Sequence, residues 1–248
     1  MTRIACLSDV HGNRHALEAV AGAVRAAAPD VVALAGDYAV NGADPAAAID
    51  LVRELETAGA LVVQGNTDIA VADGDYGAAY PWLADGVPES YRTVAEWTAE
   101  AIGPERLAWL RRLPAERRIR ADDGTLVLVT HASPGSQTAG FDPNLDPSVI
   151  LDRLGRTDAR VICCGHTHLP EVRDFGWKLV VNDGSAGYVF DGDPTASWAL
   201  LDVVDGTVTA EIKRVPYDAL AAADAVAARG LAGDVYRAAT IRTGKLVR

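Results

Sequence analysis

The chain has little cysteine, few basic residues and no long apolar run. Its three cysteines, Cys6, Cys163 and Cys164, fall inside predicted buried strands and lack the spacing of a disulfide framework, so we expect reduced thiols. The apolar runs, such as 31–35 and 61–63, end well short of a membrane span. No long apolar signal region precedes the first predicted strand, and we therefore expect a cytoplasmic protein.

Positive charge is scarce as well. The 248 residues include 34 Asp and Glu against 23 Lys and Arg, which gives a net charge of −11. A negative surface repels polyphosphate backbones, so we expect a small-molecule substrate and not long nucleic acid. The sequence gives no indication of the oligomeric state.

Strand and helix patterns alternate from the first residues onward. In the predicted helix Arg14–Ala27 the apolar residues Leu17, Val20 and Val24 recur at helical spacing. Strands alternating with helices predict a parallel α/β sheet, and the length fits one domain over residues 1–248. The predicted strands are Ile4–Ser8, Val31–Ala35, Leu61–Gln64, Arg117–Arg120, Thr125–Thr130, Arg160–Cys164, Lys178–Val181, Ala199–Val203 and Val208–Val215. The predicted helices are Arg14–Ala27, Ala46–Thr57, 95–102, 105–113, Pro147–Leu154 and Tyr217–Arg229.

The segment 69–90 interrupts this pattern. It is rich in Gly, Asp, Ala and Pro and carries Tyr76, Tyr80 and Trp82. We interpret it as a long irregular loop that leans over the active site and helps to select the substrate.

Four of the five histidines follow predicted strands directly, together with two aspartates and an asparagine. In open α/β sheets, ligands bind beyond the carboxyl ends of the strands, so these side chains should lie at one edge. Imidazole nitrogen with carboxylate and amide oxygen suits Mn²⁺, Fe or Zn²⁺. The predicted metal ligands are Asp9, His11, Asp37, Asn66, His131, His166 and His168.

Taken together and in this order, these blocks resemble the calcineurin-like metallophosphoesterase superfamily. The family pattern is Asp-x-His, Gly-Asp, Gly-Asn, His and Gly-His-x-His, and all five blocks are present between residues 9 and 168. Other segments, such as Gly184-Ser185, resemble the compact bacterial branch of YfcE-like phosphodiesterases and dinucleoside polyphosphate hydrolases. The resemblance implies a four-layer α/β/β/α sandwich, in which two mixed sheets are flanked by helices and carry a two-metal centre.

The resemblance also implies how the ligands are divided. Asp9, His11, Asp37 and His168 would hold one divalent ion, and Asp37, Asn66, His131 and His166 the other, with Asp37 as the bridge. A hydroxide shared by the two ions would attack the phosphorus, and Asp37, Asn66 and His131 would belong to the catalytic machinery. We expect manganese, although Fe, Zn, Co and Ni also suit these ligands.

One position departs from the family pattern. Many members have a His after the Gly-Asn that protonates the leaving group, whereas this chain has Thr67, whose hydroxyl is far too weak an acid. The remaining histidine, His15, is a candidate acid or phosphate contact, or else a surface residue. Without a dedicated acid, catalysis favours leaving groups that are stable as anions, such as phosphate-anhydride products and phenolates.

Leaving-group chemistry therefore favours phosphodiesters or nucleotide and dinucleoside polyphosphates as substrates. Arg14 is a candidate phosphate contact, and Tyr38 and Asn41 are candidate nucleoside contacts. Three alternatives stay open: a phosphomonoesterase or protein serine/threonine phosphatase, a nuclease, and a non-catalytic metal-binding scaffold.

Overall fold

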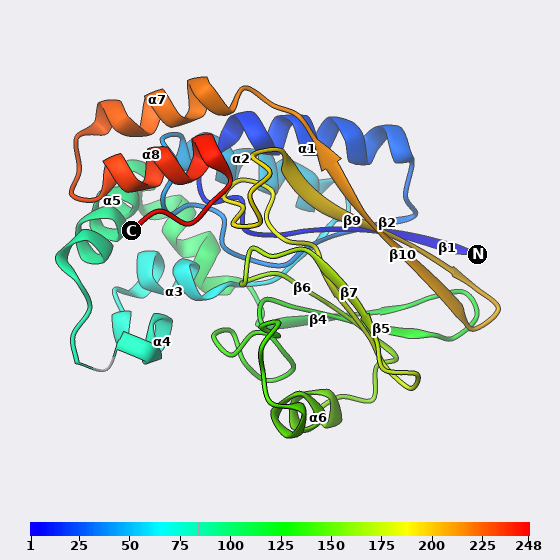
Figure 1. Cartoon of the computed structure of the whole chain (residues 1–248). Coiled ribbons are helices and arrows are strands. Elements are labelled where there is room, and N and C mark those ends of the chain that lie inside the picture. Colours follow the sequence, from blue (N-terminus) through cyan, green and yellow to red (C-terminus); the bar gives the residue numbers. More distant parts are fainter. Residues whose placement is uncertain (84) are drawn as a thin grey trace.

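The structure, a computed structural model, is described here for residues 1–83 and 85–248 (Figure 1). Two five-stranded mixed sheets pack face to face, in the orders β10-β9-β1-β2-β3 and β4-β5-β6-β8-β7. The strands are β1 (Thr2–Leu7), β2 (Val31–Leu34), β3 (Leu61–Val62), β4 (Glu116–Arg120), β5 (Leu126–Thr130), β6 (Val161–Cys164), β7 (Glu171–Asp174), β8 (Leu179–Asn182), β9 (Ala196–Val204) and β10 (Thr207–Val215).

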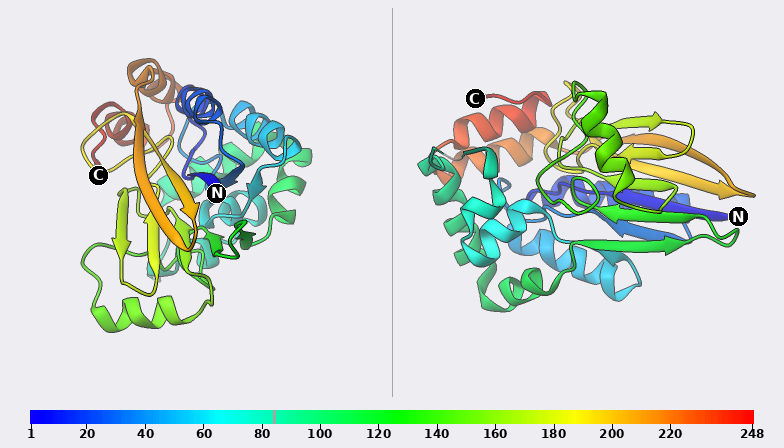
Figure 2. Two further views of the ribbon diagram at one scale, coloured as in Figure 1. Left: turned by 90° about the vertical axis from the view of Figure 1, so that its right-hand side faces the viewer. Right: turned by 90° about the horizontal axis from the view of Figure 1, so that it is seen from below.

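Helices cover the outer face of each sheet, which confirms the predicted α/β/β/α sandwich (Figures 1 and 2). They are α1 (Arg14–Ala27), α2 (Pro45–Thr57), α3 (Asn66–Asp73), α4 (Tyr76–Ala79), the 3₁₀ turn η1 (Pro81–Leu83), α5 (Glu89–Arg112), α6 (Pro147–Gly155), α7 (Ala219–Arg229) and α8 (Asp234–Thr243). No helix among these described residues is long and apolar enough to cross a membrane.

Three apolar clusters fill the spaces between the four layers. The largest lies under α1, α2 and α5 and includes Leu17, Ile49 and Leu110. A second contains residues of both sheets, such as Cys6 and Cys163, and the third packs α6 on the outer face of β6 and β8. All three cysteines are buried and unpaired, as the sequence predicted.

The predicted parallel core is present. Strands β1, β2 and β3 run parallel, with Cys6 opposite Ala33 and Leu34 opposite Val62. Parallel strands that enter a site from the same side deliver their following loops to one edge of the sheet. The hairpin turn at Asp205-Gly206 is also confirmed, because both residues have positive φ and join β9 to β10.

The prediction of an irregular loop at 69–90 is wrong. Helix α3 starts at Asn66, α4 and η1 follow, and α5 begins at Glu89. The side chain of Asp68 accepts the backbone N–H of Gly65 and so caps α3, a helix start that lies inside the predicted ligand motif. The two helices predicted at 95–102 and 105–113 are confirmed as the two parts of α5, which separate at Gly103, whose φ of 72° is not helical; the first part begins earlier, at Glu89.

Two further elements were not predicted. Strand β7 is a short edge strand in which three of the four residues are charged, and the apolar pattern does not reveal it. Helix α8 follows α7 after a turn and packs against it, with Ala223, Val226 and Ile241 in a fourth apolar cluster. The helical pair lies beside the N-terminal end of α1 (Figure 1).

Candidate metal centre

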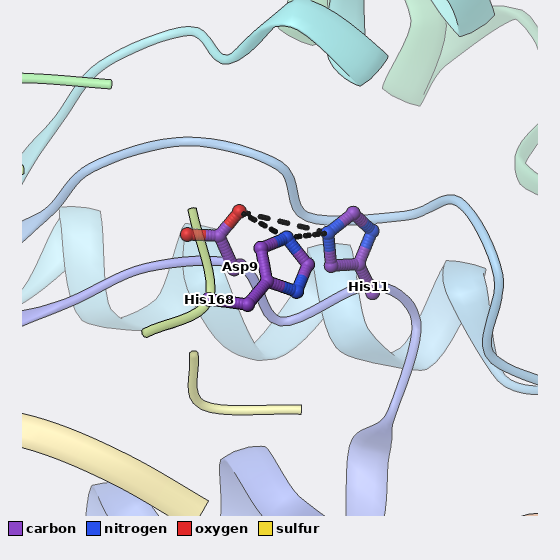
Figure 3. A group of neighbouring side chains, drawn as sticks. All are labelled: Asp9, His11 and His168. Atoms are coloured by element: carbon purple, nitrogen blue, oxygen red, sulfur yellow. Dashed lines mark hydrogen bonds and ion pairs between the residues drawn. The ribbon is translucent and has the colours of Figure 1, made fainter. Parts of the chain in front are cut away.

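The predicted ligands come together where β1, β2, β3, β5 and β6 end. Asp9 and His11 follow β1, Asp37 follows β2, and Asn66 is the first residue of α3 after β3. His131 directly follows β5, and the loop after β6 carries the remaining two histidines. Figure 3 shows Asp9 and His11, from the loop after β1, converging with His168, from the loop after β6. Six of the seven side chains are buried, and that of His166 is half-buried.

Four ligand atoms make a first group. Oδ1 of Asp9 lies 3.1 Å from Nε2 of His168 and 3.6 Å from Nε2 of His11 (Figure 3). The two Nε2 atoms lie 3.2 Å apart. Oδ2 of Asp37 lies 3.7 Å from Nε2 of His11, which makes it the fourth member.

The same Asp37 oxygen belongs to a second group. It lies 3.5 Å from Nε2 of His131, which is 2.9 Å from Oδ1 of Asn66. Nδ1 of His166 lies 3.1 Å from the Asn66 oxygen and 3.2 Å from His131 Nε2. The structure thus brings all seven predicted ligands together, with Asp37 adjacent to both groups, and the division of the ligands between two ions stays a prediction.

Hydrogen bonds between Nδ1 and backbone carbonyls orient three of the histidine rings so that Nε2 faces the metal centre. Nδ1 of His11 donates to Val40 O at 3.0 Å, and Nδ1 of His131 donates to Ala35 O at 2.7 Å. Nδ1 of His168 is bonded to the Tyr188 carbonyl. A ring that donates through Nδ1 presents an unprotonated Nε2 to the centre, which is the tautomer a metal requires.

The donor set fits divalent metal ions. Two unprotonated Nε2 atoms at 3.2 Å cannot hydrogen-bond to each other, and Oδ1 of Asp9 is a buried carboxylate oxygen without a hydrogen-bond partner. Burial is the main cause that lowers the pKa of His166 to about 4, so this ring is neutral near pH 7. Lone pairs that converge in a buried space, with nothing to donate to them, are satisfied by a cation.

Backbone strain is concentrated at these ligands. Asp9, His11, Asp37, His166 and His168 all have φ between 50° and 69°, a region that residues other than glycine rarely adopt. Outliers that cluster at one site are typical of functional positions, where the surrounding structure holds them in place.

Asp68 is a supporting residue at the centre. Its carboxylate accepts backbone N–H groups from Asp37 at 2.9 Å, Tyr38 at 3.0 Å and Gly65 at 2.8 Å. Burial and the charge of Asp37 raise the pKa of Asp68 to about 7. The residue fixes the loops of two ligands at once. Its position two residues after Asn66 was the sequence signal that could have identified this role.

Ser8 and Asp183 support the other side, and sequence reasoning missed both. Ser8 Oγ lies 2.5 Å from Oδ2 of Asp9 and 2.6 Å from Oδ1 of Asp183. One hydroxyl proton cannot serve two carboxylates, so a protonated Asp183 donating to Ser8 satisfies the chain. Burial, which outweighs the contact with Ser8, raises the pKa of Asp183 well above its usual range.

The predicted nucleoside contact at Tyr38 is wrong. Its side chain is fully buried, and its hydroxyl accepts from Gly36 N and lies within hydrogen-bond distance of the carbonyls of Val63, at 2.7 Å, and Leu34, at 3.0 Å. Asn41, with φ of 88°, lies behind His11 and accepts a hydrogen bond from Arg237. It supports the loop, and a substrate contact there stays a prediction.

Arg14 and His15 are exposed on the first turn of α1. Arg14 is paired with Glu18 at 2.7 Å. Arg14 and His15 line a pocket with Asp44, Ala222 and Ile241, on the side of α7 and α8. The structure thus places them beside the helical pair, outside the two ligand groups. Their roles as phosphate contact and acid stay predictions.

Buried imidazoles and carboxylates on an α/β/β/α sandwich define a metal-dependent hydrolase. A family model for the calcineurin-like phosphoesterase superfamily domain matches residues 2–206. An uncharacterised protein of Methanocaldococcus jannaschii is 30% identical over 235 residues, which cover 87% of this chain and 88% of that protein. The chain therefore belongs to the calcineurin-like phosphoesterase superfamily.

Solved structures share the fold. A metallophosphoesterase from Sphaerobacter thermophilus is 26% identical with a TM-score of 0.74, covering 98% of this chain and 99% of that one. A hypothetical protein from Pyrococcus horikoshii OT3 is 20% identical with a TM-score of 0.84 over the same shares. The match to both extends through the whole architecture, α7 and α8 included.

Proposed function

We propose that this hydrolase uses two divalent metal ions to cleave phosphodiesters and phosphoric anhydrides of small nucleotide-like substrates. The observation that carries the proposal is the position of Asp37 Oδ2, which lies 3.7 Å from His11 Nε2 in one group and 3.5 Å from His131 Nε2 in the other. A carboxylate oxygen shared by two sets of ligands is the arrangement that holds two ions close together.

Two ions held there would act as Lewis acids on the phosphoryl group and would lower the pKa of a water molecule. The chain's own residues hold the geometry. Asp68 fixes the Asp37 loop, and Asn66 is oriented by its Nδ2, which donates to Ala79 O at 3.0 Å.

Leaving-group chemistry follows from Thr67. Its side chain is buried next to Asn66, its N–H donates to Oδ1 of Asp37 at 2.9 Å, and its hydroxyl oxygen has no hydrogen-bond partner. A threonine hydroxyl cannot protonate an alkoxide near neutral pH. This supports substrates whose leaving groups depart as anions, which are anhydrides and aryl esters.

The test is hydrolysis by metal-free protein reconstituted with Mn²⁺. Bis-nitrophenyl phosphate, nitrophenyl phosphate, a dinucleoside tetraphosphate and a phosphoserine peptide are compared, and the bound metal is counted by elemental analysis. We expect two ions per chain and the fastest turnover on the diester or the dinucleotide. Asp37→Asn removes the shared charge and should abolish turnover, whereas Asp152→Asn, on the exposed face of α6, should leave it unchanged.

Other outcomes favour the alternatives. Fastest turnover on the phosphopeptide would indicate a protein phosphatase with another proton donor, for which His15→Ala is the direct test. Two bound metals without turnover on any ester would favour a scaffold. Manganese as the native metal and the cytoplasmic location stay predictions, which metal analysis and fractionation of the native protein would decide.

A further inference from the structure

An exposed tryptophan lies beside the second ligand group. The ring of Trp82, in η1, lies 5.9 Å from the ring of His166, centroid to centroid, at an angle of 67°. More than half of the Trp82 side chain, 53%, is exposed. Large aromatic side chains are normally kept out of water. An exposed one next to a predicted metal-binding residue is therefore a candidate contact for a bound small molecule.

Trp82 belongs to an aromatic cluster that we define as Tyr80, Trp82 and Tyr91. Tyr80 is buried and meets Trp82 at 5.8 Å and Tyr91 at 5.1 Å, both edge to face. Tyr91 is 41% exposed. Two accessible rings are therefore supported by one buried ring.

The cluster is fixed to the metal centre through the chain. Ala79, the residue before Tyr80, accepts the hydrogen bond from Nδ2 of Asn66 that orients this ligand. The negative charge of Asp37 contributes to the raised pKa of Tyr80, although burial is the larger cause. The aromatic surface thus lies next to the predicted site of bond cleavage and is connected to it by this hydrogen bond.

We propose that Trp82 stacks against the base of a nucleoside phosphate whose phosphates lie at the two ligand groups. The proposal rests on the proposed phosphoesterase function and names its substrate class. A flat, uncharged ring next to a phosphate site suits a base, because base–aromatic stacking needs a π-face and tolerates any base. An inorganic polyphosphate or a phosphoserine peptide offers no such ring. Tyr91 forms the other accessible part of the surface.

The experiment compares ATP with inorganic tripolyphosphate, which share the anhydride bond and differ in the nucleoside. The Mn²⁺-loaded full chain is assayed as wild type, Trp82→Ala and Trp82→Phe. Trp177→Ala is the matched control, because Trp177 is 51% exposed and lies in the turn between β7 and β8. We expect Trp82→Ala to raise KM for ATP about tenfold while kcat and the KM for tripolyphosphate stay unchanged.

The conservative variant separates stacking from structure. Trp82→Phe keeps an aromatic face and should restore KM for ATP to within about threefold of wild type. The proposal is overturned when Trp82→Ala raises both KM values equally, or neither, since stacking acts on the nucleoside alone.

A binding measurement keeps this test independent of turnover. Quenching of tryptophan fluorescence by ADP should be seen in the wild type and in Trp177→Ala, and should be largely lost in Trp82→Ala. Should no phosphoester be hydrolysed, the proposed function fails while this titration still decides on the stacking surface. Equal quenching in Trp82→Ala and wild type overturns the proposal in either case.

Discussion

Nε of Arg237, in α8, donates a hydrogen bond to Oδ1 of Asn41 at 3.2 Å, which connects the last helix to the loop behind His11. Asp234 pairs with both Arg237 at 3.1 Å and Arg229 at 2.6 Å, and all three side chains are at least nine-tenths buried. Arg229 also donates to the carbonyls of Asn41 and Gly42. The family model ends at residue 206, so this support for a ligand loop comes from outside the matched region.

Removing Arg237 should destabilise the protein and weaken the first ligand group. Arg237→Ala leaves the carbonyl of Ser90 and the side chain of Asn41 without their donor, and we expect a loss of about 3 kcal/mol in the free energy of unfolding. Denaturant unfolding with and without Mn²⁺ measures this. Arg242→Ala, on the same helix with an exposed partner, should cost less than about 1 kcal/mol. Equal losses for the two variants would contradict the role of the buried cluster.

Gly165 should tolerate no side chain. An added Cβ would lie 1.9 Å from Ser8 Oγ and 2.2 Å from Oδ2 of Asp9, so Gly165→Ala must displace one of them. We expect weaker metal binding in calorimetry and a destabilisation of about 1–3 kcal/mol. The matched control is Gly155→Ala at the end of α6, where nothing lies within 4 Å and the helix should gain up to about 1 kcal/mol. Unaltered metal affinity in Gly165→Ala would show that the Asp9 position is adjustable.

Asp183 should make the metal-free protein less stable as the pH rises. Burial holds its folded-state pKa well above the usual value of 3.8, so the folded chain retains a proton that the unfolded chain releases. The contribution of Asp183 to the free energy of unfolding is fully present below pH 3.8 and declines as the pH rises toward the folded-state pKa. Urea unfolding in a chelator between pH 5 and pH 8 should show a shallower decline for Asp183→Asn.

Asp202→Asn gives the control for that profile. Its hydrogen bond with Arg3 lowers the pKa of Asp202, so its contribution is present above the unfolded-state pKa and is lost only as the pH falls through the folded-state value. Between pH 5 and pH 8 this variant should change stability by a constant amount. A wild-type slope retained in Asp183→Asn would mean that Asp183 is ionised in the fold.

Introducing an acid at position 67 should extend the range of leaving groups. We expect Thr67→His to accelerate hydrolysis of an alkyl phosphodiester tenfold or more, because a positioned imidazolium can protonate an alkoxide. The rate on bis-nitrophenyl phosphate should change little, since nitrophenolate departs without a proton. Steady-state kinetics on both esters decides, with thermal unfolding as the check on folding. An equal change in rate on the two substrates would contradict the idea that the wild-type enzyme lacks a general acid at position 67.

The sequence by itself determined the alternation of strands and helices and the position of the ligands in the chain, whereas the order of the four layers was implied by the family resemblance. Short apolar runs identified β1 and β2, and apolar residues at helical spacing identified α1 and α2, because burial imposes these patterns on the residues themselves. The ligand motifs were visible because each polar residue follows a strand directly. The segment 69–90 and α8 were misread, since their helices are weakly amphipathic and gain stability from neighbours that are distant in sequence.

Only the tertiary structure decided which residues support the centre and which do not reach it. Asp183, Ser8 and Arg237 act on ligands through contacts that span up to 196 positions in the chain, and no local pattern encodes such a contact. Tyr38, next to Asp37, turns into the core, while Trp82 stands beside His166 across 84 residues. Side-chain direction and distant packing are set by the folded environment, and for this reason adjacency in sequence predicted the ligands but not their surroundings.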